Sequence, residues 1–334
     1  MTTEHRRTFA CFGGQCTVLI ADAMRPADAA AAAAMAQRRL LEWNARFSRF
    51  EPSSELSMLN RDPRFQVAVS PLMRRLIEAA VGASRQTDGL VDATLGAEIE
   101  RAGYGSHIDG DGVPLSQALA LAPPRAPASG NPAGRWRQIS VDRRKGSVIR
   151  PPGLALDLGG IAKGVFADEL ATLLAGFDAF AVDCAGDLRI GGRAETQREV
   201  HVASPFTETV LHTFALDRAA AATTGIGRRS WLTDDGRAAH HLLDPGTGAP
   251  AFTGVVQATA LASTAAEAEV LAKAAVLRGP RGAAAWLSHG GVIVYEDGGY
   301  EVLEPAAAEV GTRPEIQVRR SASTSSRSGS LTIS

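Results

Sequence analysis

The sequence predicts an α+β fold in a single large domain, with antiparallel or mixed sheets and helices packed on them. Strand and helix patterns alternate irregularly, unlike the regular βαβ order of a doubly wound fold. Alternating residues around turn residues predict two hairpins, one at 136–151 with its turn at Arg144–Gly146 and one at 292–303 with its turn at Asp297–Gly299. A chain of 334 residues is long enough to bury a large core without disulfides.

The first half of the chain predicts a strand and several helices before a long irregular connector. The strand lies around Cys16–Ile20, and a helix follows over about Pro26–Phe47, because proline favours the first helical turn. Ser70-Pro71 opens a further helix, whose apolar residues recur at helical spacing. Another helix ends near Gly103, and the proline- and glycine-rich residues 105–135 form the connector.

The second half predicts strands and helices joined by tight turns. Residues 154–164, LALDLGGIAKG, are predicted to form a strand that enters a glycine pair and then a helix. A helix follows the strand at 254–263, and a last helix is expected over Arg281–His289. The remaining strands are predicted at 180–192, as a strand–turn–strand, at 199–204 and at 209–216.

The last predicted element is the hairpin at 292–303. From Glu304 onward the chain consists mainly of Ala, Ser, Thr and Arg, with few large apolar side chains. A segment of this composition buries too little apolar surface to offset the entropy of folding. We therefore expect a disordered C-terminal tail over residues 304–334, above all over 318–334.

Charge and composition exclude several classes of protein. The 35 Lys and Arg residues nearly balance the 36 Asp and Glu residues, for a net charge of −1, so binding of nucleic acid is not expected. The longest apolar run, Ala29–Ala36, is too short to span a bilayer, so membrane insertion is not expected. Three cysteines without a CxxC pair, and a start without an apolar leader, predict a cytoplasmic protein.

Five segments carry glycines and polar residues in a specific order, whereas the common phosphate-loop, zinc-protease and serine-hydrolase motifs are absent. The segments are 47–60 (FSRFEPSSELSMLN), 87–96 (TDGLVDATLG), 155–164 (ALDLGGIAKG), 183–192 (DCAGDLRIGG) and 223–250 (TTGIGRRSW to HHLLDPGTGAP). In this order they resemble the ApbE family of FAD:protein FMN transferases, over roughly residues 8–303. Asp157–Gly164 reproduces the family motif without a change, and His241–Gly248 keeps each of its fixed polar positions.

The resemblance implies a fold and an activity. An ApbE-like domain, of T-fold type, would bind FAD as its substrate, and a Ser or Thr hydroxyl of an acceptor protein would attack the phosphate nearer the flavin. AMP would leave, and FMN would stay on the acceptor as a phosphoester. Family members use Mg²⁺ to neutralise the pyrophosphate, since phosphoryl transfer depends on positioning and cationic charge. The expected partner is a flavin-acceptor protein with a Ser/Thr-containing motif.

The resemblance also assigns residues to the site. It places Lys163 against FAD and the carbonyl of Gly160 at a metal-ligand position. A structural ion pair is the alternative for Lys163, because a lysine in an apolar setting needs an anionic partner. His241, followed by an unbroken Asp-Pro-x-Thr-Gly, is expected to be a catalytic and FAD-binding residue, whereas its neighbour His240 is not. Asp187, which closes a Gly-Asp turn, is expected to be structural.

Five further positions are candidate FAD contacts. Leu90, Val91 and Asp92 match the family run that lies against FAD, with valine in place of the usual phenylalanine. Phe50 matches an aromatic flavin-contact position, and Phe12 stands where the family usually has methionine. Both phenylalanines fit a place in the core equally well.

One stretch departs from the family in a way that changes its chemistry. The family's Ala-Asp-x-x-x-Thr, whose Asp and Thr bind Mg²⁺ from one helix face, is Ala268–Lys273 here. Glu269 replaces the Asp and Lys273 replaces the Thr, and a lysine ammonium donates hydrogen bonds but cannot bind a metal. Residues Val270–Leu277 are apolar all round except for Lys273, which predicts a buried helix in which Glu269 is the partner of the lysine.

Three interpretations of this substitution stay open. Lys273 supplies the positive charge that Mg²⁺ brings elsewhere, or the protein is a degenerate flavin binder, or it retains an altered metal site at Gly160 and Glu269. The first interpretation makes Lys273 a catalytic residue and predicts transfer of FMN from FAD to an acceptor Ser or Thr. The alternatives are a non-catalytic FAD-binding carrier or regulator, and an FAD hydrolase that gives FMN and AMP.

Overall fold

In the described part of the chain, the main sheet has eight strands, and every neighbouring pair is antiparallel. The computed structural model describes residues 4–105, 112–207, 209–233, 235–305 and 331–333. The strands, in their order across the sheet, are β1 (Glu4–Cys11), β2 (Gly14–Ala21), β6 (Ala179–Cys184), β7 (Asp187–Gly191), β10 (Ala220–Gly225), β13 (Val255–Ala262), β14 (Gly291–Tyr295) and β15 (Tyr300–Leu303). The strand that was expected to come first is therefore β2, and β1 precedes it.

Three smaller sheets occur among the described residues. Their strands, in order, are β3 (Gln66–Ala68), β5 (Ser147–Ile149) and β4 (Ser140–Asp142); β11 (Ser230–Leu232) and β12 (Ala238–His240); and β16 (Leu331–Ile333), β8 (Arg198–Ala203) and β9 (Val210–Leu216). The last sheet is mixed, because β16 runs parallel to β8 while β9 runs antiparallel to it. The prediction of an α+β fold with antiparallel and mixed sheets is confirmed.

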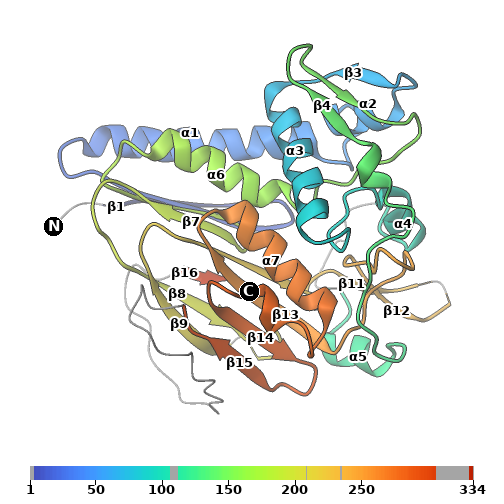
Figure 1. Ribbon diagram of the computed structural model, residues 1–334. Helices are drawn as coiled ribbons and strands as arrows, with labels where there is room; N and C mark the ends of the chain where they lie inside the picture. Colours follow the sequence, from blue (N-terminus) through green and yellow to red (C-terminus); the bar gives the residue numbers. More distant parts are fainter. Residues whose placement is uncertain (1–3, 106–111, 208, 234, 306–330, 334) are drawn as a thin grey trace.

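Three of the described helices pack on the main sheet. These are α1 (Pro26–Phe47), α6 (Ala162–Leu174) and α7 (Ala265–Arg278), and α6 contacts both of the others (Figure 1). The other helical elements are α2 (Glu55–Arg61), α3 (Pro71–Gln86), α4 (Gly96–Arg101), α5 (Leu115–Ala120) and the 3₁₀ turns Arg135–Gln138 and Ala284–Trp286. Among the helices described, none is long and apolar enough to cross a membrane.

Helices α6 and α7 approach each other closely at Gly164. A Cβ atom at this position would lie 2.7 Å from backbone atoms of Ala265 and Ala266, which is too close for real atoms. One turn later, the Asp168 carboxylate accepts hydrogen bonds from the N–H groups of Ala265 (2.9 Å) and Ala266 (3.0 Å). The carboxylate therefore caps the N-terminus of α7. This joint brings the middle of α7 against the start of α6, where Lys163 lies.

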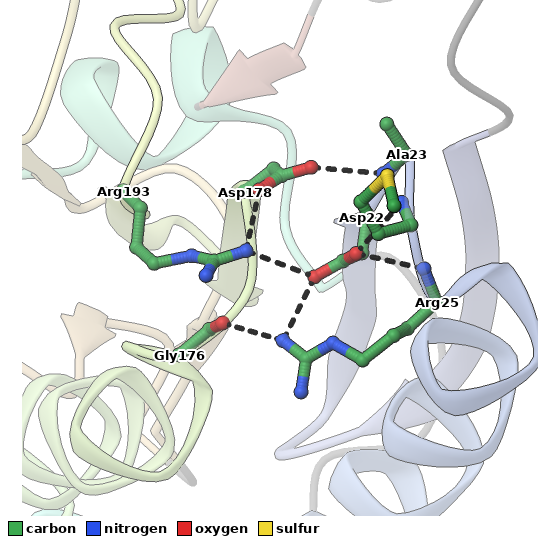
Figure 2. A network of polar contacts seen from close by, with 7 residues as sticks. Asp22, Ala23, Arg25, Gly176, Asp178 and Arg193 are labelled. Atoms are coloured by element: carbon green, nitrogen blue, oxygen red, sulfur yellow. Dashed lines mark hydrogen bonds and ion pairs between the residues drawn. The ribbon is translucent and has the colours of Figure 1, made fainter.

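A buried aspartate connects the start of α1 to the loop before β6 and to the loop after β7. Asp22 Oδ1 accepts a hydrogen bond from the N–H of Arg25 (2.9 Å), and its Oδ2 lies 3.0 Å from Nη2 of Arg25 and 3.3 Å from Nη2 of Arg193 (Figure 2). Arg193 also lies 2.6 Å from Asp178, which accepts a hydrogen bond from the N–H of Ala23 (2.8 Å). This network holds the β2–α1 corner in place beside the main sheet.

Three local predictions are wrong. The connector expected to be irregular over residues 105–135 contains helix α5 (Leu115–Ala120). Residues 154–158 form an extended segment without strand pairing, held by Asn60. The Asn60 side chain donates a hydrogen bond to the carbonyl of Leu156 (2.8 Å) and accepts one from its N–H (2.9 Å). These bonds replace those of a strand ladder. The helix expected over Arg281–His289 is only the short turn Ala284–Trp286, in a segment with glycines close to both ends.

The C-terminal prediction is wrong for three residues. Leu331–Ile333, within the stretch expected to be disordered, form β16 beside β8. The side chains of Leu331 and Ile333 are 3% and 1% exposed and belong to the main core. Leu331 and Ile333 alternate with an exposed residue, and this short pattern is enough to form a strand. The polar composition of the surrounding segment is the reason that the strand was not predicted. Residues 306–330 and 334, which the same prediction covers, lie outside the described residues.

Candidate active site

Two lysines and one glutamate meet where α6 faces α7. Nζ of Lys163 and Nζ of Lys273 lie 3.9 Å and 3.8 Å from Oε1 of Glu269. The other carboxylate oxygen accepts a hydrogen bond from the N–H of Gly164 (3.1 Å). Glu269 is only 2% exposed, so the lysines offset a charge that would otherwise be buried alone. The pairing of Glu269 with Lys273 on a buried helix, expected from the sequence, is present.

The nearest partner of Lys163 is Asp187, the first residue of β7. Nζ lies 2.5 Å from Oδ2 of this buried carboxylate. Burial raises the pKa of Asp187 to about 7; Glu269 adds to the rise and Lys163 opposes it. Burial also acts to lower the pKa of Lys163, but the charges of Asp187 and Glu269 outweigh it and raise that pKa. The structural ion pair that was the alternative interpretation of Lys163 is therefore present. Contact between Lys163 and FAD stays a prediction.

Gly160 lies directly against Lys273. A Cβ atom on Gly160 would lie 3.0 Å from Cε and 3.6 Å from Nζ of the lysine, so a side chain here would displace it. Asp157 fixes the turn that carries Gly160: its Oδ1 accepts a hydrogen bond from the N–H of Gly159 (2.7 Å), and its Oδ2 lies 3.1 Å from Nε of Arg49. The glycine turn and α7 therefore hold the Lys273 ammonium between them.

The two adjacent histidines have different surroundings. His240, at the end of β12, is 1% exposed, its ring packs edge-on against Phe252, and burial lowers its pKa to about 3. His241 donates its N–H to the carbonyl of Arg229 (3.2 Å), and its Nδ1 has no hydrogen-bond partner among the described residues. Burial lowers the pKa of His241 well below its usual value, and the charges of Arg229 and Lys273 add to this effect. At pH 7 the His241 ring is neutral, in a form that can accept a proton.

Phe12 occupies the turn between β1 and β2. Its φ of 56° and the φ of 71° at Gly13 give the left-handed backbone of a two-residue hairpin turn. This conformation costs a residue other than glycine about 1–2 kcal/mol. The Phe12 ring stacks on Phe166 of α6, with 5.7 Å between ring centroids, and its carbonyl accepts a hydrogen bond from Nη2 of Arg229 (2.7 Å). A contact between Phe12 and flavin stays a prediction.

Phe50 belongs to a second, smaller apolar cluster. The Arg49 guanidinium lies over the rings of Phe50 and Tyr104, at 4.1 Å and 4.8 Å from their centroids, and Tyr104 stacks on Trp231 at 5.4 Å. Because Arg49 also contacts Asp157, this cluster is linked to the glycine turn beside Lys273.

The predicted FAD-contact run 90–92 lies partly in the core. Leu90 and Val91 are 1% and 8% exposed and pack in the main apolar core. Asp92 Oδ1 accepts hydrogen bonds from the N–H (2.8 Å) and hydroxyl (2.7 Å) of Thr94, while its buried Oδ2 has no partner within the described ranges. Burial raises the pKa of Asp92. The structure gives the two apolar side chains a packing role, and contact of all three residues with FAD stays a prediction.

The ApbE family matches residues 12–295, which are most of the chain and include both Lys163 and Lys273. The chain belongs to the ApbE family. It is 27% identical over 251 residues to the FAD:protein FMN transferase of Vibrio cholerae, with 72% of each chain covered. It is 24% identical over 249 residues to the FAD:protein FMN transferase of Haemophilus influenzae, with 70% of this chain and 68% of that protein covered.

Solved structures of ApbE proteins have the same fold. The crystal structure of the ApbE protein from Thermotoga maritima matches with a TM-score of 0.72 at 25% identity, over 90% of this chain and 97% of that one. The flavin transferase ApbE from Vibrio cholerae matches with a TM-score of 0.69 at 21% identity, over 92% of this chain and 98% of that one. The resemblance found in the sequence, and the ApbE-like fold that it implied, are confirmed.

The residues at the expected metal position do not fit Mg²⁺. This ion requires a near-octahedral set of oxygen ligands. Lys273 places an ammonium group against Gly160, and the carboxylate of Glu269 is already shared by two lysines and an N–H group. In the part of the chain that the structure describes, no group of three or more His, Cys, Asp and Glu side chains could hold a metal ion. An altered metal site at Gly160 and Glu269 is therefore not supported by this arrangement.

Sequence reasoning missed Arg49, Tyr104, Trp231 and Arg229 at this site. Arg49, Trp231 and Arg229 lie inside segments that carried the family resemblance, but none of them stands in a spacing pattern that marks a function. An arginine between turn residues usually lies in solvent. Only the folded chain places Arg229 between the Phe12 turn and His241.

Proposed function

We propose that this protein transfers the FMN moiety of FAD to a Ser or Thr hydroxyl of an acceptor protein and releases AMP. Membership of the ApbE family and relatives named FAD:protein FMN transferase support the proposal. The observation that carries it is the Lys273 ammonium, held against Gly160 and Glu269 in the same region as the neutral His241. A charge at this point serves phosphoryl transfer, which needs electrostatic stabilisation more than covalent help.

In the proposed reaction, the acceptor oxygen forms a bond to the phosphorus nearer the flavin. The bond between that phosphorus and the bridging oxygen breaks, and its electron pair leaves on AMP. The hydroxyl proton passes to His241, which is neutral and therefore able to accept it. Lys273 stabilises the negative charge that grows on the phosphate oxygens. Lysine thus takes the place of the cation that family members are expected to bind.

The other candidate positions contact FAD in this proposal. Lys163 and Asp92 are its polar contacts, and Phe12 and Phe50 contact it through their rings. The 90–91 segment contributes main-chain contacts, since its side chains are buried. The AMP half of FAD adds contacts that FMN lacks, so FAD should bind more tightly than FMN.

The decisive experiment combines the purified protein, FAD and an acceptor domain with a Ser/Thr-containing motif, in the presence of EDTA. In-gel flavin fluorescence and intact mass report FMN on the acceptor. Transfer should be lost in His241→Ala and strongly reduced in Lys273→Ala, and His289→Ala, which changes an exposed histidine, should behave as wild type. Bound FAD without transfer would make the protein a carrier or regulator. FMN and AMP formed without an acceptor would make it a hydrolase, and either outcome contradicts the proposal.

A further inference from the structure

Arg229 is a cation at this site that has no carboxylate partner among the residues that the structure describes. Lys163 and Lys273 both lie within 4.0 Å of Glu269. Among the described residues, by contrast, no Asp or Glu oxygen forms an ion pair with Arg229. Its guanidinium instead donates a hydrogen bond to the backbone carbonyl of Phe12, at 2.7 Å. Since a guanidinium has five N–H donors, most of its hydrogen-bonding capacity stays available for a ligand.

The guanidinium lies near other positive charge, because it bonds to Phe12, whose ring stacks on Phe166 of α6, the helix that carries Lys163. Burial is the main reason that the pKa of Lys273 and the pKa of His241 are lowered, and the charge of Arg229 lowers both further. Like charges in a partly buried region are unfavourable unless an anion lies between them. The nearby carboxylates of Asp187 and Glu269 are already held by the lysines. The arrangement therefore favours an anionic ligand beside Arg229.

Both the side chain and the backbone of Arg229 are held by hydrogen bonds. Its side chain is held by the carbonyl of Phe12, in the left-handed turn, and a Cβ atom on Gly13 would lie 3.5 Å from its Nη2. Its own carbonyl accepts the N–H of His241. A cation that is ordered before binding loses less side-chain entropy when its ligand arrives.

We propose that Arg229 and Lys273 together bind the pyrophosphate of FAD, with one cation for each of its two negative charges. This inference rests on the proposed function and names the part of FAD that these residues recognise. The planar guanidinium matches pairs of phosphate oxygens, while the ammonium acts as a point charge. Arg229 is then the residue that makes the site select a flavin with phosphates over one without them.

The test compares the binding of FAD with that of riboflavin, the same flavin without phosphates, to wild type, Arg229→Gln and Arg229→Lys in EDTA. The Kd of FAD should rise about tenfold or more in Arg229→Gln, as expected for loss of a charge-assisted hydrogen bond. The Kd of riboflavin should change by less than about twofold, and Arg229→Lys should retain part of the FAD affinity. Arg237→Gln removes one exposed positive charge from the β11–β12 hairpin and is the matched control.

Equal losses for FAD and riboflavin would overturn the inference, because Arg229 would then only tie the turn to the loop. Unchanged FAD affinity in Arg229→Gln would overturn it as well. Melting temperatures of the ligand-free variants report any damage to the fold, and Arg229→Lys keeps the charge if the glutamine disturbs the turn. A wild-type protein that binds FAD through Arg229 but transfers no FMN would contradict the proposed function and leave the pyrophosphate site standing.

Discussion

The ammonium group of Lys273 lies 3.8 Å from the carboxylate of Glu269, one turn earlier in the buried helix α7. On an exposed helix, such a pair contributes only about 0.3–0.5 kcal/mol. Here the two side chains are 13% and 2% exposed, so removing one partner leaves a buried charge, which costs about 3–5 kcal/mol. The same pair occupies the position at which the family resemblance implied metal ligands.

The effect of Mg²⁺ and of a chelator on FMN transfer tests the role of the Glu269–Lys273 pair directly. FMN transfer should persist in EDTA, and added Mg²⁺ should raise it by less than about twofold, because the protein carries the cation itself. The double variant Lys273→Thr/Glu269→Asp restores the family's ligand types, so its activity should be lost in EDTA and recovered with Mg²⁺. Transfer rates to an acceptor domain, with and without chelator, measure both effects. Wild-type activity that EDTA abolishes and Mg²⁺ restores would contradict the replacement of the metal by Lys273.

Loss of the Lys163 charge should destabilise the protein. Lys163→Met leaves the Asp187 carboxylate buried without its partner, at an expected cost of about 3–5 kcal/mol in the free energy of unfolding. Lys163→Met/Asp187→Asn should recover much of that loss. The control is Arg143→Met, which breaks an exposed pair with Glu78 and should cost less than about 1 kcal/mol. Urea unfolding gives the four values, and equal costs for the buried and the exposed pair would disprove the argument.

Acid should destabilise the fold through His240. Burial lowers the pKa of His240 to about 3 in the folded protein, whereas histidine in an unfolded chain titrates near 6.5. Between these values only the unfolded state binds the proton, so stability falls by about 1.4 kcal/mol for each unit of decreasing pH. His240→Gln should lose about 2 kcal/mol less than wild type between pH 6.5 and 5.

Urea unfolding at pH 7.5, 6.5 and 5 measures this difference. Protonation of Asp183 and Asp187 raises the stability of the fold as the pH falls through the same range. The reason is that burial raises their pKa values to about 6 and about 7, so the folded state binds these protons more readily than the unfolded state. Their contribution is common to wild type and variant, so the comparison isolates His240. His289→Gln changes an exposed histidine and should follow wild type. Parallel pH profiles for wild type and His240→Gln would show that His240 is not the acid-sensitive group.

The β16 strand should contribute to stability. Ile333→Ala removes a side chain that is 1% exposed and should cost about 2–4 kcal/mol, whereas Thr332→Ala, on the exposed face of the same strand, should change stability by less than about 0.5 kcal/mol. Deletion of residues 318–334 should lower the melting temperature for the same reason. Differential scanning calorimetry measures all three proteins. A truncated protein that melts together with the full chain would show that β16 adds nothing to the fold.

Local sequence patterns were sufficient for several parts of this protein. The hairpin predicted at 292–303 is present as β14 and β15, and the one at 136–151 as β4 and β5. The apolar run Val270–Leu277 is a buried helix, with Lys273 paired to Glu269 one turn earlier. In each case the interacting residues are close in the chain, so spacing alone predicts their contact.

The rest of the site depends on contacts between distant segments. Lys163 lies 24 residues from Asp187, Gly164 lies 105 residues from Glu269, and Arg229 lies 217 residues from Phe12. A buried charged group needs a partner of opposite charge, but the sequence alone does not show which residue is that partner. The choice depends on the approach of α6 to α7 and on the position of the β1–β2 turn beside the β10–β11 loop. That packing gives Lys163, which is expected to contact FAD, a carboxylate partner in Asp187, and it makes a loop arginine a candidate ligand for phosphate.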